Sequence, residues 1–347
     1  MKFAATTLLT LFALTVFAQE PVLLNDFTTS GASTFDFDPE IEGIVMKPTP
    51  GIDASDRLFF EADDGIHGDE LWRSDGTEVG TQLVKDIRPG EDNSGINFIE
   101  AVGNTVYFGA TDGEHGYELW KSQGTAASTQ MVIDLNEGSG SGFNTGFGRH
   151  VYFNDVLYFS GSSDKGTELY RTDGTAAGTT LVKDINPNVT GSGLPFSSSP
   201  SRMTAAQNII YFVANDGEHG MELWRTDGTT AGTVLVKDIS EGASSTNFYQ
   251  MKTFDNNILV FVADDGVNGR NLWISLGTAQ TTYMLTDFTE GEGDSGIEIL
   301  EGWTQPGNPD SFLYFTIKES FRRRLWKTNG NPGNAQLVEG FGANGSN

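Results

Sequence analysis

A repeated segment of about 50 residues constrains the fold of this chain more than any other feature. Its best-preserved part reads ELWRSDGTEVGT at residues 70–81, and an aromatic residue lies at the centre of each copy. The six central aromatic residues are Trp72, Trp120, Tyr170, Trp224, Trp273 and Trp326. A period of this size is typical of stacked supersecondary units. Residues shared by all copies therefore mostly build the repeat, and a unique site should lie where a copy breaks the pattern.

Each copy has the pattern of four short β-strands. In residues 95–135, a β-branched and aromatic run, TVYFGA at 105–110, is followed by an Asp-Gly turn that is typical of hairpins. Four antiparallel strands per unit describe one blade of a propeller. We predict an all-β fold, a six-bladed β-propeller of four-stranded antiparallel blades in a single domain, residues 19–347. The predicted repeat units are residues 42–87, 96–135, 147–185, 200–239, 248–288 and 297–341.

The outermost strand of the repeat occurs once more often than six blades require. Copies of it fall at residues 23–27, 83–87, 131–135, 181–185, 235–239, 284–288 and 336–341. We predict that the extra N-terminal strand, near Leu24, pairs in the last blade beside the strand near Leu337. That pairing would close the propeller and remove the open edges that an acyclic array exposes.

The first 18 residues have the pattern of a signal peptide. Lys2 gives a positive start, an apolar run follows, and Val16-Phe17-Ala18 fits a cleavage site before Gln19. We therefore expect a secreted protein, extracellular or at the cell surface, with the periplasm as an alternative. No other apolar stretch is long enough to span a bilayer, so we expect no membrane insertion. The chain contains no cysteine, which excludes a disulfide framework.

The formal net charge of −26 limits the possible partners. Nucleic acids and anionic lipids both require a basic face, so neither is expected to bind. The charge is consistent with a soluble monomer with a solvated acidic surface, and also with affinity for divalent cations.

The segments ELWRSDGTEVGT (70–81), ELYRTDGTAAGT (168–179) and ELWRTDGTTAGT (222–233) carry a family resemblance. They resemble the ELWxxDGT repeats of secreted bacterial proteins, and the match covers about residues 57–290. The resemblance implies an exported repeat protein, and it brings no established activity, substrate or catalytic residue. The DGT turn is also similar to the Asp-box of sialidases, which is structural there and does not imply a glycosidase.

Two sets of acidic residues are candidate calcium ligands. One set lies in the Asp-Gly hairpins, and the other lies in the loops that follow the outermost strands. The candidates are Asp64, Asp112, Asp216 and Asp265 in the hairpins, and Asp92 and Asp294 in the loops. Clustered carboxylates in flexible loops suit calcium, which takes about 6–8 oxygen ligands. The alternative is that these carboxylates cap their own turns, because Asp is a common turn former. Calcium is the one cofactor that we consider.

Three residues break the repeat at the start of a predicted innermost strand. Arg149 and Arg202 align with Phe98, and His150 is the only histidine outside the repeated hairpins. If that strand lines a central channel, these residues place positive charge near one mouth. Guanidinium groups bind carboxylate or sulfate bidentately, so an anion site is one interpretation. The alternative is that the arginines neutralise neighbouring carboxylates.

Long loops supply the remaining candidates, because binding residues often lie on loops of a rigid scaffold. The loop over residues 186–202, between the third and fourth units, is long. Trp303 is the only tryptophan outside the repeat and is a candidate for stacking on a sugar.

The sequence contains no nucleophile motif, P-loop or metalloprotease signature. We therefore predict a secreted, non-catalytic propeller that acts as a binding or structural module for a surface protein or a polysaccharide. One alternative is a polysaccharide-active hydrolase or lyase with its site around Arg149, His150 and Arg202. Another is a scaffold stabilised by calcium.

Overall fold

Six four-stranded antiparallel sheets make up the described part of the chain, and each sheet keeps its strands in sequence order. The computed structural model describes residues 51–52, 57–144, 146, 148–254, 257–287, 296–300, 312–319 and 322–340. We number the sheets as blades one to six. The predicted signal peptide, residues 1–18, lies outside the described residues.

The first three blades contain strands β1 to β12. Blade one consists of β1 (Gly51–Ile52), β2 (Leu58–Asp63), β3 (Asp69–Ser74) and β4 (Gln82–Lys85). Blade two consists of β5 (Asn97–Val102), β6 (Thr105–Ala110), β7 (Glu118–Ser122) and β8 (Gln130–Ile133), with the 3₁₀ turn η1 (Ala126–Ser128). Blade three consists of β9 (His150–Phe153), β10 (Val156–Ser163), β11 (Gly166–Thr172) and β12 (Thr180–Lys183).

The last three blades contain strands β13 to β24. Blade four consists of β13 (Ser201–Ala205), β14 (Ile210–Asn215), β15 (Met221–Thr226) and β16 (Val234–Lys237). Blade five consists of β17 (Asn247–Phe254), β18 (Ile258–Asp264), β19 (Arg270–Ser275) and β20 (Tyr283–Met284), with the 3₁₀ turn η2 (Ala279–Thr281). Blade six consists of β21 (Glu298–Ile299), β22 (Leu313–Glu319), β23 (Arg322–Thr328) and β24 (Gln336–Gly340).

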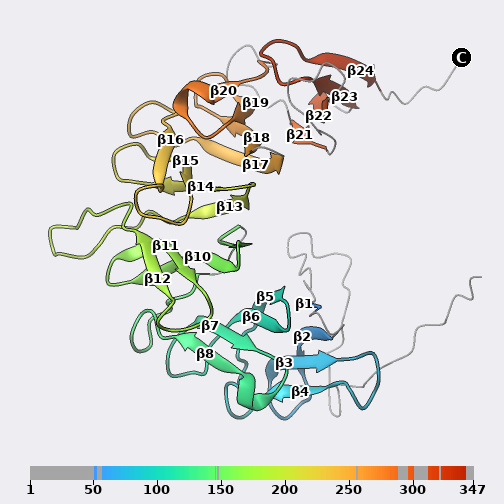
Figure 1. Ribbon diagram of the computed structural model, residues 1–347, viewed down its shortest axis with the longest axis vertical. Coiled ribbons are helices and arrows are strands. Elements are labelled where there is room, and N and C mark those ends of the chain that lie inside the picture. The colour runs from blue at the N-terminus through green and yellow to red at the C-terminus, as the bar shows by residue number, and fades with distance from the viewer. Residues whose placement is uncertain are drawn as a thin grey trace, which may run out of the picture.

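The blades follow one another along an arc, with first strands such as β5 and β13 on its concave side and fourth strands such as β8 and β16 on its convex side (Figure 1). This arrangement confirms the predicted all-β architecture of six four-stranded antiparallel blades. The predicted closed ring is not seen, because blades one and six lie apart at the two ends of the arc (Figure 1). The strand near Leu24 that was predicted to close the ring lies outside the described residues.

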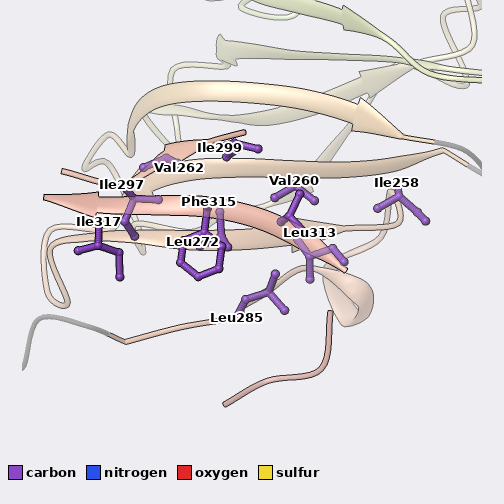
Figure 2. Packing of buried hydrophobic residues seen from close by; sticks show 11 residues of the cluster. Ile258, Val260, Val262, Leu272, Leu285, Ile297, Ile299, Leu313, Phe315 and Ile317 are labelled. Carbon is purple, nitrogen blue, oxygen red and sulfur yellow. The ribbon is translucent and has the colours of Figure 1, made fainter. Parts of the chain in front are cut away.

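The apolar core lies between neighbouring blades. At the junction of blades five and six, Val260 and Leu272 pack with Leu313 and Phe315, each of which is fully buried (Figure 2). The second strand of a blade has a packed blade on each face, which explains why β18 reads ILVFVAD with its first six residues buried. Each blade therefore depends on its neighbours for burial. No helix in the described part of the chain has the length and hydropathy needed to cross a membrane.

Candidate functional site

The glutamate of the ELW motif is buried and holds the loop that leads to the next blade. Glu222 is fully buried; its carboxylate accepts the backbone N–H of Ile239 at 2.9 Å and both the N–H and the hydroxyl of Thr246, at 3.1 and 2.7 Å. Burial raises the pKa of Glu222 to about 7, against these hydrogen bonds. Glu118 makes the same kind of contacts, and burial raises its pKa to about 7 as well. The repeated glutamate is therefore a loop clamp, a role that the sequence did not reveal.

The DGT turn fits against the preceding blade. Asp227 accepts the backbone N–H and the hydroxyl of Thr229 at 2.9 and 2.7 Å, so the aspartate caps its own turn. The glycine of the turn faces an aromatic ring of the preceding blade. A Cβ at Gly174 would lie 2.2 Å from the Tyr107 hydroxyl oxygen, and Gly174 has a φ of +86°. The turn therefore requires glycine for both its backbone conformation and its packing.

Lysines of the fourth strands reach the central tryptophans of the next blades. Lys183 Nζ lies 5.6 Å from the ring centroid of Trp224 and donates to the carbonyl of Thr233 at 2.8 Å. Lys85 and Lys237 make equivalent contacts at their own junctions. The glutamate, tryptophan, aspartate and glycine of the motif are thus engaged in assembling blades, so a binding function has to be sought elsewhere.

The hairpin aspartates predicted as calcium ligands are hydrogen-bonded within their own turns. Asp216 Oδ1 accepts the N–H of Glu218 and of His219, both at 2.9 Å, and Oδ2 lies 2.8 Å from His219 Nδ1. Burial opposes the charged form, but the bonds from His219 outweigh it and hold the pKa of Asp216 below its ordinary value. Asp64 and Asp112 repeat the arrangement with their own histidines, and Asp265 repeats it with Asn268.

The loop carboxylates are not gathered into a cation site where the structure describes them. Asp92 is exposed and pairs with Arg88 at 3.2 Å, and Asp294 lies outside the described residues. Among the described residues, no group of three or more His, Asp or Glu side chains is placed to hold a metal ion. Calcium binding stays a prediction.

The pattern-breaking arginines lie where the alignment placed them. Strand pairing skips one residue between Asn97 and Ile99, which leaves Phe98 at a bulge. In β13 the pairing skips Arg202 and Met203 opposite the single residue Phe212, which is also a bulge of one extra residue. Phe98 and Arg202 share a positive φ, at 52° and 54°. Arg149 immediately precedes β9. Phe98 and Arg202 therefore lie in the first strands of blades two and four, and Arg149 lies just before the first strand of blade three.

The side chains of the predicted anion site point to three different blades. Arg202 donates to the carbonyl of Tyr249 in blade five at 2.9 Å. The His150 ring packs on Phe98 of blade two, with 4.0 Å between centroids, and burial lowers its pKa to about 4. Arg149 stays on its own blade, with Nη1 3.5 Å from Ser160 Oγ. The imidazole is therefore neutral near pH 7. Within the described residues neither arginine pairs with a carboxylate, so the expected charge neutralisation is not seen there.

The long loop between blades three and four forms an ordered hairpin. Val189 pairs with Pro195 in a β-bridge, and two backbone bonds, from Thr190 to Leu194 at 2.8 Å and from Phe196 to Asn188 at 2.9 Å, hold its two sides together. Its base is fixed to blade three, since Glu168 accepts the N–H of Ser198 at 2.9 Å. In Figure 1 this yellow-green loop projects from the sheets beside β11 and β12.

This hairpin presents three apolar side chains to solvent. Val189, Leu194 and Phe196 are 60%, 64% and 47% exposed. Residues 186–201 contain no charged side chain, in a protein of net charge −26. We call residues 188–196 the apolar hairpin. Its length marked the loop as a candidate in the sequence, and the uncharged run was a second signal. Trp303, the other loop candidate, lies outside the described residues.

Comparisons with known proteins give only distant structural similarity. No family model matches the sequence, and no curated protein matches it. Similar solved structures include the β-propeller domain of the Trilobed protease from Pyrococcus furiosus, at 12% identity and a TM-score of 0.38, covering 83% of this chain and 82% of that one. An oligogalacturonate lyase in complex with manganese is 12% identical with a TM-score of 0.40, covering 69% of this chain and 63% of that one.

The chain spans less than half of the length of the prolyl peptidases that it is similar to. Prolyl oligopeptidase B from Galerina marginata is 10% identical with a TM-score of 0.45, covering 84% of this chain and 43% of that one. A structure of prolyl endopeptidases is 9% identical with a TM-score of 0.42, covering 82% of this chain and 42% of that one. Similarity this distant does not assign an activity to this chain. The architecture is assigned from the six sheets of this structure itself.

Proposed function

We propose that this protein is a secreted propeller of the ELWxxDGT-repeat type that acts as a non-catalytic binding module for a surface protein or a polysaccharide. The apolar hairpin makes the contact. The observation that carries the proposal is the exposure of Val189, Leu194 and Phe196 on an uncharged loop that is fixed to an otherwise acidic scaffold.

The build of the apolar hairpin supports a binding role. Exposed apolar groups that gather on one loop mark interaction sites more often than scattered ones do. The bonds across the hairpin and the clamp on Ser198 hold the loop in place before a partner arrives, which reduces the entropy cost of binding. A rigid apolar loop of this kind suits insertion into a complementary recess of a partner.

The composition of the hairpin favours a protein over a polysaccharide as partner. Val189 and Leu194 offer aliphatic surface, whereas sugar recognition relies on aromatic faces together with directed polar groups. Phe196 is the only aromatic side chain of the hairpin. The acidic body would accelerate association with a basic partner and would repel an acidic one.

The test compares two serine variants of the mature protein. The first carries Val189→Ser, Leu194→Ser and Phe196→Ser, which remove the apolar surface of the hairpin. The matched control carries Ile66→Ser and Val267→Ser, at exposed tips in other blades that are 62% and 70% exposed. Binding to isolated surface proteins and to an array of polysaccharides is measured for both.

We expect the hairpin variant to lose protein binding by about tenfold or more, since 1.4 kcal/mol of contact energy is a factor of ten. The control should bind like the unmodified protein. Equal losses in both variants, or no loss in either, would reject the hairpin as the contact surface. Binding of the unmodified protein to the polysaccharide array alone would replace the protein partner by a glycan.

We also propose that the N-terminal strand near Leu24 closes the propeller in the last blade. The seventh copy of the fourth-strand sequence supports this, since six blades already have their own fourth strands. Closure would cover the edges that the arc leaves open.

A further inference from the structure

The apolar hairpin has one open edge. Val189 and Pro195 face each other across it, and the two backbone bonds that hold the hairpin together are made by the residues on either side of this pair. In an antiparallel ladder such a pair is not hydrogen-bonded, so the backbone groups of Val189 and Pro195 point outward. No described residue bonds to the N–H or the C=O of Val189. Pro195 has no N–H, so its side of the hairpin is a poor edge for another strand. We call the other side the Val189 edge.

The two faces beside this edge both carry exposed apolar side chains. Because side chains alternate along a strand, Leu194 and Phe196 lie on one face of the hairpin and Val189 lies on the other. All three are exposed, so neither face is covered. A Cβ at Gly191, two residues beyond Val189, would meet nothing within 4 Å, so the space there is open. An open edge between two uncovered apolar faces is what a strand presents when its neighbour in a sheet is missing.

The surroundings of the Val189 edge are acidic. Asn188, at the start of the hairpin, contacts the hairpin of blade four, because a Cβ at Gly217 would clash with Asn188 Nδ2. Glu218 follows Gly217 and is exposed at the tip of that hairpin. The apolar hairpin itself has no charged residue, and the whole chain has a net charge of −26. A strand that approaches this edge is therefore favoured if it carries Lys or Arg and disfavoured if it carries Asp or Glu.

We propose that the Val189 edge binds an extended segment of the partner protein by strand addition, and that this segment alternates apolar with basic side chains. Main-chain bonds to Val189 would supply affinity, and the apolar faces together with Glu218 would select the side chains. This inference rests on the proposed function, because it names the partner of the same hairpin. A second copy of this chain is a poorer occupant, since both scaffolds are strongly acidic.

Hydrogen exchange of the unmodified mature protein, read at single amides by NMR, tests strand addition with defined probes. The main probe is a seven-residue peptide of alternating lysine and valine. One control peptide has the same side chains and N-methyl groups throughout, so it cannot donate backbone bonds. The other control peptide replaces each lysine by glutamate.

We expect the Val189 amide to exchange about tenfold more slowly when the lysine–valine peptide is at a tenfold excess over its dissociation constant. The Thr190 amide already bonds to Leu194 within the hairpin, so its exchange should change little. The N-methylated peptide should have no effect at Val189, and the glutamate peptide should have a weaker one.

Three results would overturn the proposal. Unchanged exchange at Val189, or equal slowing by the N-methylated peptide, would exclude strand addition. Equal slowing by the glutamate peptide would exclude a basic segment as the preferred partner. Slowing at Val189 that grows with protein concentration in the absence of peptide would replace the partner by a second copy.

A pair of proline variants separates this inference from the proposed function. Val189→Pro removes the outward N–H, and the matched control Pro195→Val adds an N–H on the opposite edge. Slow exchange at Thr190 verifies that the hairpin is intact in each variant. We expect Val189→Pro to bind the isolated surface proteins about tenfold more weakly, a factor that corresponds to about 1.4 kcal/mol, and Pro195→Val to bind like the unmodified protein.

The serine variant of the hairpin completes the comparison. Full binding by Val189→Pro beside a loss in the serine variant would overturn strand addition and leave the binding role of the hairpin in place. Full binding by the serine variant would instead reject the proposed function itself.

Discussion

The buried glutamates should make the protein more stable as the solution is acidified. Glu222 has an ordinary pKa of 4.5, and burial raises it to about 7 in the folded state. Between these two pH values the native state binds a proton that the unfolded chain does not. The free energy of unfolding therefore rises as pH falls from about 7 to about 4.5. Glu118 acts in the same direction over the same window.

The size of the effect follows from the two pKa values. The interval from 4.5 to about 7, at about 1.36 kcal/mol per pH unit, corresponds to about 3 kcal/mol for Glu222 when the whole window is crossed. Glu222→Gln removes the titrating group, so this part of the pH dependence should disappear. His150, whose pKa is lowered, opposes the trend in both proteins and cancels in the comparison.

The assay is urea unfolding of the unmodified protein and Glu222→Gln at pH 7.5, 6.5 and 5.5. The variant also loses a hydrogen bond at any pH, because its amide nitrogen faces a backbone N–H, at a cost of about 1–3 kcal/mol. The decisive quantity is therefore the difference in slope with pH. Glu218→Gln, on an exposed hairpin tip, is the control and should leave the slope unchanged. Equal slopes for the unmodified protein and Glu222→Gln would refute the reasoning.

Three further predictions concern the junctions, the closing strand and calcium. Gly174→Ala should destabilise the protein more than Gly138→Ala, because both glycines have a positive φ but only Gly174 meets a neighbouring side chain. Urea unfolding should show a loss of about 1 kcal/mol in the free energy of unfolding for Gly138→Ala and a clearly larger loss for Gly174→Ala. Equal losses would contradict the packing role of Gly174. Deleting residues 19–28 should lower the melting temperature by several degrees. An unchanged melting temperature would rule out the proposed closure by the N-terminal strand. If the acidic loops bind calcium, the melting temperature should be higher in millimolar calcium than in EDTA. At a hundredfold excess over the dissociation constant, binding adds about 2.7 kcal/mol to the free energy of unfolding. An unchanged melting temperature would reject the calcium scaffold.

Much of the architecture could be predicted because the repeat displays its own strand pattern. The run at 105–110 and the Asp-Gly turn after it place β6 and its hairpin, and the same pattern recurs in the other units. The alignment of Arg202 with Phe98 also agrees with the structure, since both lie at a bulge. Period and turn chemistry are local properties, and a single sequence displays them directly.

The candidate sites were less predictable because they depend on contacts between blades. Arg149 and Arg202 are close in the aligned repeat, yet their side chains diverge, since each follows the packing of a different neighbour. Glu222 is charged in the sequence and fully buried in the structure, because a loop from its own blade's far edge supplies its hydrogen-bond donors. Burial of a charged side chain has no signal in residue type alone.

The contacts from tyrosine to glycine and from lysine to tryptophan all run from one blade to its successor, which gives the array a direction. The tyrosine contact starts from blades two, three and four, whereas blade five has Val260 at the matching position, so the same junction recurs along the middle of the array. Removing the stretch from the end of blade two to the end of blade three would bring Tyr107 to Gly228, a glycine that already receives a tyrosine from its present neighbour. Recombination can therefore add or remove a whole unit of this kind while the contact between tyrosine and glycine at the new junction stays the same, so the length of the array can change while its fold is kept.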